Sequence, residues 1–457
     1  MRWGRRRAFV RQWRPSRRRR FVPADIEGMG PSFDSSGAGG AARRRRAFGR
    51  LSNSCGPGLL VARAVVLVGS VVYIAARFSD RGALVNIGFW LALAGLAMVI
   101  FGGGAREFAA ILQSRVAMAC AAYAAAIACS ILVAPDVETA WRSFRSAHGR
   151  AFISAMFVAY AASRPEHARW LLAAIAMGAV VVSLKQSAEH WAHWLAAGQV
   201  SPAYQVIRKN APGHAFYLPA LIAVALLAAK RWLRIGLAVA ALGEAALMLF
   251  AAARGAWLSV AAGSLVAAVM SRRWRLLAVL AISVVALGGI VVMLLPEHLI
   301  AVRLQHGFST SGRVAGTWGP ALDLIAERPV IGYGYGPEAF DQAFDAAVTH
   351  HPEWGVQRSI GPHNIYLGAW VAGGPLLLGT MLWTFFEVGV ALVGAFRASD
   401  DSDVRALATA SLAAFVSAYV VHGLFEDPLW LAFGILLGLS IGLRRASCRC
   451  RSSAPPL

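Results

Sequence analysis

Long apolar runs follow one another along most of the chain, separated by short polar stretches. Each run holds about 18 to 22 apolar residues, and at about 1.5 Å per helical residue it can cross the hydrocarbon core of a membrane. The predicted membrane-spanning helices number twelve and begin near Leu59, Ala83, Val116, Ala151, Trp170, His214, Trp232, Ala256, Leu276, Asn364, Ala406 and Leu429. We therefore expect an all-α integral membrane protein, with a helical non-cytoplasmic loop between the ninth and tenth helices.

The composition supports a membrane protein and shows where its positive charge lies. Of the 457 residues, 58% are hydrophobic and only 15% are charged, which is too apolar for a soluble chain of this length. The formal net charge is +22, and residues 1–50 hold 15 of the 45 basic residues. We predict that residues 1–58 form a disordered, Arg-rich cytoplasmic tail that touches anionic membrane lipids and binds no nucleic acid.

The short loops between the predicted spans orient the chain. Basic residues concentrate in every second loop, as the positive-inside rule requires of cytoplasmic loops. These residues are Arg106, Arg115, Arg164, Arg169, Lys230, Arg231, Arg234, Arg272, Arg273, Arg275, Arg397 and Arg405. Both termini are therefore predicted to be cytoplasmic, flanking a polytopic domain over residues 59–445, with residues 446–457 as a second tail. Arg142, Arg145 and Arg150 oppose this topology, because they fall in an outside loop.

Two outside segments are long, residues 186–213 and residues 296–362. Between spans that are joined elsewhere by tight turns, such segments are typical of functional sites. Apolar residues of the second segment recur at helical spacing, which predicts an amphipathic helix on the membrane surface that ends before Pro329. This stripe consists of Trp318, Leu322, Ile325 and Ala326. A second short helix is predicted to begin at Pro337 and to carry Phe340 and Phe344.

Four basic residues in the predicted outside regions are candidates for binding phosphate. Arg254 lies at the outer end of the seventh span, Arg313 opens the amphipathic helix, and Arg208 and Lys209 lie in the first long segment. A guanidinium group offers five donors that match an oxyanion. The alternative at each position is a snorkelling or solvated side chain. As a set, these residues suit an anionic lipid diphosphate better than a neutral sugar.

His363 lies where the second long segment turns into the tenth span, at the N-terminus of that helix. A helix N-terminus disfavours the imidazolium form, so we expect a neutral ring that can accept a proton. His363 is therefore a candidate general base, and its neighbour Asn364 is a candidate substrate-binding residue. The alternative for His363 is an amphipathic anchor at the membrane interface.

The segment Pro329-Val-Ile-Gly-Tyr-Gly-Tyr-Gly336 contains three glycines at alternate positions. A nucleotide-binding loop is excluded, because the strand, turn and helix that such a loop needs are missing. Gly332 and Gly334 instead permit a tight path that would bring backbone N–H groups near the membrane surface, where they are candidates for binding a phosphate.

For four other polar residues a structural role is the favoured interpretation, and a functional role is the alternative. Glu244 lies within the seventh span and is expected to pair with a basic neighbour, with the lining of a substrate cavity as the alternative. His422, Glu426 and Asp427 fall in the short outer turn before the last span. We interpret them as a polar turn, with acceptor binding as the alternative.

Four motifs between residues 210 and 443 resemble those of the O-antigen ligase and O-antigen polymerase superfamily of envelope glycosyltransferases. The motifs are Arg254-Gly255, Ser311-Gly-Arg313 followed by Trp318, Arg328-Pro-Val-Ile-Gly-Tyr-Gly334, and His363-Asn-Ile-Tyr-Leu367 leading to Gly373 and Gly374. No motif is specific alone, whereas the order and spacing of all four are specific. The Arg-rich tail is not part of the family pattern.

The resemblance implies a metal-independent, inverting glycosyltransferase without a cofactor in the bacterial inner membrane. It would transfer a glycan from undecaprenyl diphosphate to a hydroxyl of the lipid A core at the periplasmic face, with Arg254 and Arg313 holding the diphosphate and His363 as the base. A polymerase that extends the carrier-linked glycan shares these motifs and is the alternative. A transporter or flippase would need repeated halves and several ionisable residues at the midplane, and the sequence favours neither this class nor a scaffold.

Overall fold

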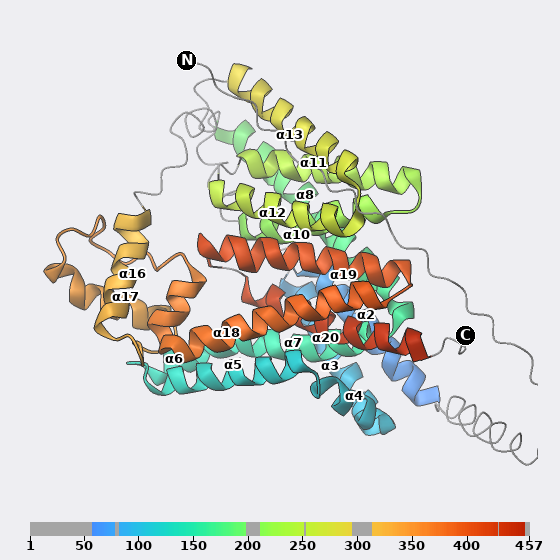
Figure 1. The fold of residues 1–457 in the computed structure, drawn as a ribbon, viewed down its shortest axis with the longest axis horizontal. Coiled ribbons are helices and arrows are strands. Elements are labelled where there is room, and N and C mark those ends of the chain that lie inside the picture. Colours follow the sequence, from blue (N-terminus) through green and yellow to red (C-terminus); the bar gives the residue numbers. More distant parts are fainter. Residues whose placement is uncertain are drawn as a thin grey trace, which may run out of the picture. The chain divides into compact units, whose positions relative to one another are not determined.

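A computed structural model of the chain describes residues 57–77, 82–197, 211–250, 253–294, 313–427 and 429–452, which contain helices and no strand (Figure 1). The α-helices are α2 (Pro57–Ala76), α3 (Gly82–Val99), α4 (Ala105–Leu112), α5 (Arg115–Leu132), α6 (Val137–Phe144), α7 (Arg150–Ala162), α8 (Ala168–Ala197), α10 (Ala211–Leu227), α11 (Arg231–Phe250), α12 (Arg254–Ser271), α13 (Trp274–Leu294), α16 (Gly319–Glu327), α17 (Pro337–Ala347), α18 (Ile365–Ala398), α19 (Ser402–Phe415) and α20 (Trp430–Ser452). Wider π-helical turns are η1 (Ile100–Gly104), η2 (Arg145–Gly149), η4 (Val314–Trp318) and η6 (Val416–Val421), and 3-10 turns are η3 (Pro165–His167), η5 (Val348–His350) and η7 (His422–Leu424). The predicted all-α fold class is confirmed for these residues, and most of the predicted Arg-rich tail lies outside them.

Each of the twelve predicted spans begins within, or next to the first residue of, a described helix. Among the described residues, nine helices are long and apolar enough to cross a membrane. Two further apolar stretches are shorter: Ala211–Leu227, which is α10, and Trp274–Ile290, which is part of α13. Helix α7 has 13 residues. The chain is therefore a multi-pass membrane protein, while the count of twelve spans stays a prediction.

Small residues let the short helix α7 pack tightly against α20. Gly434, Gly438 and Gly442 follow one another at four-residue spacing along one face of α20. A Cβ atom at these three positions would lie 2.2, 2.7 and 2.5 Å from carbonyl oxygens of α7. Such close approach is how helices associate in lipid, where apolar side chains gain little from leaving the hydrocarbon. The small residues along this face of α20 thus serve helix packing.

Helix α18 is broken within its first third. Gly373 and Gly374 leave the helical conformation, with φ −149° and φ +63°, and Pro375 has no N–H group to donate. The break removes the helical partners of nearby carbonyl groups, which then need other donors. The carbonyl oxygens of Val371 and Ala372 accept hydrogen bonds from a distant part of the chain instead.

That distant part belongs to residues 313–364, here called the loop segment. The N–H groups of Tyr333 and Gly334 donate to the carbonyl oxygens of Val371 and Ala372 over 2.8 and 3.0 Å. The hydroxyl of Tyr335 lies 2.7 Å from Nδ1 of His148, a buried side chain at the end of η2. The break in α18 therefore serves as the docking point of the loop segment.

The loop segment has its own apolar core and carries both predicted helices, α16 and α17, which lie together in Figure 1. As predicted, the first ends before Pro329, and the second begins at Pro337 and carries Phe340 and Phe344, whose side chains are buried. On α16 the side chains that face this core are Ala321, Leu324 and Ile325. Leu322 of the predicted stripe is 54% exposed. That α16 lies on a membrane surface stays a prediction.

Candidate active site

His363 and Glu426 form the centre of the site. Nδ1 of His363 lies 2.8 Å from Oε2 of Glu426, although 63 positions separate the two residues in the chain. His363 ends the loop segment just before α18, and Glu426 lies in the turn between η7 and α20. Their side chains are 34% and 30% exposed, so the pair is partly buried yet open to a reactant. When Nδ1 carries the ring proton and donates a hydrogen bond to the carboxylate, Nε2 keeps a lone pair that can accept a proton.

The backbone around His363 is built to present this side chain. His363 has a φ of +45°, which side-chain-bearing residues rarely adopt, and such strain is common at functional sites. The next residue, Asn364, caps α18 by accepting hydrogen bonds from the N–H groups of Tyr366 and Leu367. The Tyr366 hydroxyl donates to the carbonyl of Val420 in the π-helical turn η6 over 2.9 Å. The start of α18 is thereby fixed to the helix that leads to Glu426.

Arg313 binds the same turn from the other side. Its Nη2 lies 3.4 Å from Oε1 of Glu426, and its Nη1 donates a hydrogen bond to the carbonyl oxygen of Phe425. The guanidinium group also lies over the Phe425 ring, 5.7 Å from its centroid. These contacts use two of its five N–H donors, and the side chain is 32% exposed. Arg313 can therefore bind an anion while it stays in contact with Glu426.

Arg254 begins α12 beside this turn. Its neighbour Gly255 touches Phe425, since a Cβ atom on Gly255 would lie 2.8 Å from the Cβ atom of Phe425. The N-termini of α12 and α18 thus meet around residues 425 and 426, in the turn that follows η7. The three predicted catalytic residues, Arg254, Arg313 and His363, are brought to one side of the helical bundle. Which compartment this side faces stays a prediction.

The electrostatics of the pair differ from the expectation based on the helix N-terminus. The hydrogen bond to Glu426 raises the pKa of His363 above its ordinary value, outweighing burial, which lowers it. For Glu426, burial alone would raise the pKa, but the hydrogen bond from His363 and the charges of His363 and Arg313 bring it below its ordinary value. The facing carboxylate therefore favours the protonated ring, which is opposite to the effect expected of the helix N-terminus.

Three of the five predicted substrate-binding residues lie in the described part of the chain, where they make contacts within the protein. The amide oxygen of Asn364 is used by the helix cap, and the N–H of Gly334 donates to Ala372. At Gly332, with φ +76°, a Cβ atom would lie 2.4 Å from the carbonyl oxygen of Val371, so this glycine serves close packing. These contacts give no support to phosphate binding by Gly332 or Gly334. Arg208 and Lys209 lie outside the described residues, and all five assignments stay predictions.

Sequence reasoning missed the roles of Glu426 and Phe425. The sequence favours a polar turn for Glu426, with acceptor binding as the alternative, and does not predict its contacts with both His363 and Arg313. The available signal was a carboxylate in an outside turn, on the side where His363 and Arg313 were expected. Phe425 gives no such signal, because its contribution is a backbone carbonyl and an aromatic face.

Glu244 has the paired arrangement that we expected. One carboxylate oxygen lies 2.5 Å from Nδ1 of His214, and the other accepts a hydrogen bond from Ser183. The side chains of Glu244 and His214 are fully buried between α8, α10 and α11. An intramembrane carboxylate held by two partners is consistent with a structural pair.

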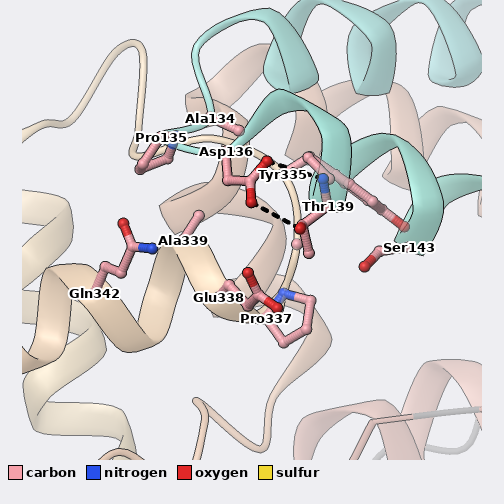
Figure 2. Close-up of a pocket in the computed structure, with 12 residues that line it drawn as sticks. Ala134, Pro135, Asp136, Thr139, Ser143, Tyr335, Pro337, Glu338, Ala339 and Gln342 are labelled. Atoms are coloured by element: carbon pink, nitrogen blue, oxygen red, sulfur yellow. Dashed lines mark hydrogen bonds between the residues drawn. The ribbon is translucent and has the colours of Figure 1, made fainter.

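A small cavity lies near the docked loop segment, between the start of α6 and the start of α17 (Figure 2). Its lining includes Asp136, Thr139, Tyr335, Glu338 and Gln342, and its volume is about 10 Å³. Asp136 caps α6 by accepting from the N–H of Thr139 over 3.0 Å, and it also accepts from the Thr139 hydroxyl. A volume of this size holds about one water molecule, so the cavity is too small for a sugar ring.

The sequence was compared with known proteins. Residues 237–384 match a family model described as O-antigen ligase. An O-antigen ligase of Salmonella typhimurium (strain LT2) is 32% identical over 203 residues, which is 42% of this chain and 48% of that protein. The chain thus spans about half the length of the curated relative that it matches. Both matches confirm the resemblance to the O-antigen ligase superfamily, and the family match includes Arg254, Arg313 and His363 but ends before Glu426.

Proposed function

On the basis of this likeness to the O-antigen ligase superfamily, we propose that the protein transfers a glycan from undecaprenyl diphosphate to a hydroxyl of the lipid A core, at the periplasmic face of the bacterial inner membrane. The observation that carries the proposal is the contact of Glu426 with both His363 and Arg313. An imidazole ring and a guanidinium group that contact one carboxylate support a base and an anion-binding group in the same site.

His363 acts as the general base in this reaction. Nε2 takes the proton of the acceptor hydroxyl while the hydroxyl oxygen forms a bond to the anomeric carbon. Glu426 accepts a hydrogen bond from Nδ1–H of His363, which fixes the tautomer and the plane of the ring, and its negative charge stabilises the imidazolium ion that forms. Attack opposite to the departing diphosphate inverts the configuration of the anomeric carbon.

Arg313 and Arg254 act on the leaving group. The bond between the anomeric carbon and the diphosphate oxygen breaks with its electron pair, so negative charge grows on the diphosphate. Guanidinium groups that face this oxygen stabilise the developing charge in the transition state. Two arginines thus supply electrostatic stabilisation that a divalent metal ion supplies in other transferases, and we propose that the transfer chemistry needs no metal.

A reconstituted transfer assay tests the proposal. The purified protein is mixed with an undecaprenyl-diphosphate glycan and lipid A core, in parallel without and with EDTA, and the products are separated by size. Glycan on the lipid A core supports a ligase. Glycan that grows on the carrier without reaching the core indicates the polymerase alternative, and the absence of both products, with the donor instead moved across a vesicle bilayer, would contradict a transferase and indicate a flippase.

A further inference from the structure

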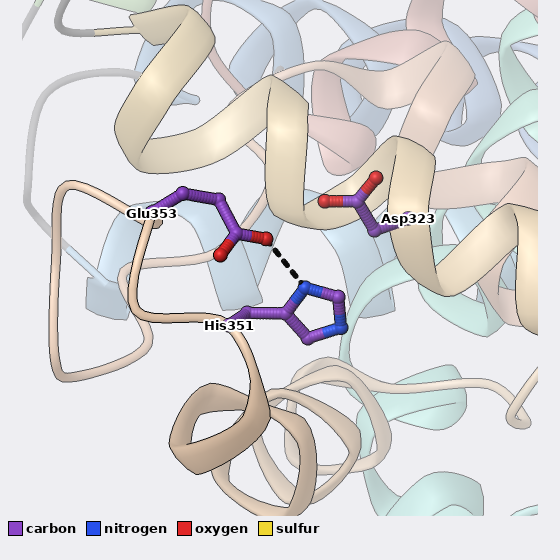
Figure 3. Close-up of side chains that lie close together, drawn as sticks. All are labelled: Asp323, His351 and Glu353. Carbon is purple, nitrogen blue, oxygen red and sulfur yellow. Dashed lines mark hydrogen bonds and ion pairs between the residues drawn. The ribbon is translucent and has the colours of Figure 1, made fainter.

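Three side chains of the loop segment converge outside the site described above, as Figure 3 shows. Asp323 comes from α16, while His351 and Glu353 come from the loop that follows η5. One potential ligand atom from each residue lies within 4.8 Å of the others. Nδ1 of His351 is 2.7 Å from Oε1 of Glu353. An imidazole and two carboxylates from separate parts of the chain therefore share a space small enough for one ion.

A single tryptophan holds two of these side chains in place. The indole ring of Trp354 stacks on His351, with ring centroids 4.5 Å apart and an interplanar angle of 8°. Its Nε1 donates to a carboxylate oxygen of Asp323 over 2.9 Å. Trp354 is only 4% exposed and packs in the apolar core of the loop segment. Buried packing thus fixes two of the three ligand positions, those of Asp323 and His351, as surrounding residues do for the ligands of metal sites.

The local charge favours a cation. A third carboxylate, that of Glu327, lies 3.9 Å from Nε2 of His351 and is held by a hydrogen bond from the Tyr333 hydroxyl. Three acidic side chains therefore surround one histidine. An imidazole ligand selects transition metals over Ca²⁺ and Mg²⁺, and Zn²⁺ commonly takes histidine nitrogen together with carboxylate oxygen.

We propose that Asp323, His351 and Glu353 bind a divalent transition-metal ion of the Zn²⁺ class. The ion would join α16 to the loop after η5. This loop is already tied to the π-helical turn beside Arg313, because the N–H of Gly355 donates to the carbonyl of Ala315 over 3.0 Å. The metal therefore stabilises the part of the loop segment that positions Arg313, and takes no part in glycan transfer.

Zinc binding by the purified full-length protein tests this site. Protein stripped with chelator is titrated with Zn²⁺ in competition with a fluorescent indicator. We expect one competing site per chain, with affinity lowered at least about tenfold in His351→Ala and in Asp323→Asn. The second variant keeps an oxygen that can accept from Trp354, so its loss of affinity reports ligation rather than packing. His350→Ala, an exposed neighbour in the same turn, should bind Zn²⁺ as the wild type does.

Thermal unfolding supplies a second readout. Zn²⁺ should raise the melting temperature of the wild type and of His350→Ala, but not that of His351→Ala, since only a folded site binds the ion. Equal Zn²⁺ affinity in the wild type and both ligand variants would overturn the proposal, as would no binding by the wild type. Neither readout involves glycan transfer, so failure here leaves the proposed function untouched.

Discussion

The carboxylate of Glu426 lies 2.8 Å from Nδ1 of His363 and presents its other oxygen to Arg313 at 3.4 Å. One acidic residue thus orients the proposed base and also contacts a proposed anion-binding group. Glu426 can therefore contribute in two ways that mutagenesis can distinguish. It orients the imidazole ring of His363, and its negative charge stabilises the imidazolium ion.

Glu426→Gln and Glu426→Ala should differ in their effects on transfer. The glutamine can still accept a hydrogen bond from Nδ1–H of His363 through its amide oxygen but has no charge, so we expect a rate loss of about tenfold. The alanine also loses orientation of the ring, and we expect a loss of about 10² to 10³-fold. Turnover in the reconstituted assay measures both. Equal rates for the wild type and Glu426→Ala would show that Glu426 does not serve the base.

The pH dependence of the transfer rate follows from the raised pKa of His363. A general base must be neutral before it reacts, so the transfer rate should fall as the pH drops through that raised pKa. Glu426→Gln removes the carboxylate that raises it, so the acid limb of its profile should move to lower pH. Rate profiles of the wild type and the variant between pH 5 and pH 9 measure the shift. An acid limb that stays in place would show that another group titrates.

Turnover should depend on the shape of the side chain at position 313 as well as on its charge. Arg313→Ala should lower turnover by about 10² to 10³-fold, the usual cost of one group that stabilises transition-state charge. Arg313→Lys keeps the charge but loses the fork of donors, so an intermediate loss is expected. Arg358→Ala, an exposed arginine of the loop segment, is the matched control and should retain activity. A loss of donor affinity with unchanged turnover would place Arg313 in ground-state binding instead.

The break in α18 should be needed for stability. At Gly374, with φ +63°, a Cβ atom would lie 1.9 Å from the carbonyl oxygen of Val330, so Gly374→Ala should lower the free energy of unfolding by more than about 2 kcal/mol. Gly379 lies in the same helix with nothing within 4 Å of a Cβ atom, and Gly379→Ala should be neutral or slightly stabilising. Thermal unfolding in detergent compares the two. Equal melting temperatures would contradict the docking role of the break.

Much of the architecture could be predicted from hydropathy, because each span must satisfy its backbone internally and cover itself with apolar side chains. The twelve predicted starts coincide with helices for this reason. The packing of α16 could not be predicted in the same way. Its sequence pattern predicts that Leu322 belongs to an apolar stripe. In the structure, Ala321, Leu324 and Ile325 are the residues of α16 buried in the core of the loop segment.

The site could be predicted only in part. Arg254, Arg313 and His363 carry charge or a titratable ring at predicted helix ends, which local sequence reveals. The partner of His363 could not be found locally, because Glu426 lies in a turn after another span and meets His363 only through the packing of α18 on η6. Likewise, the N–H of Gly334 has a protein partner only because α18 breaks at Gly373 and Gly374.

The central claim is that His363 is the base of a glycan transfer, and its most direct test is turnover by His363→Ala in the reconstituted assay. The matched control is His350→Ala, whose side chain is an exposed histidine of the same loop segment. We expect the His363 variant to lose about 10² to 10⁴-fold in turnover while donor binding persists, and the control to retain wild-type turnover. Wild-type turnover by His363→Ala would contradict the account.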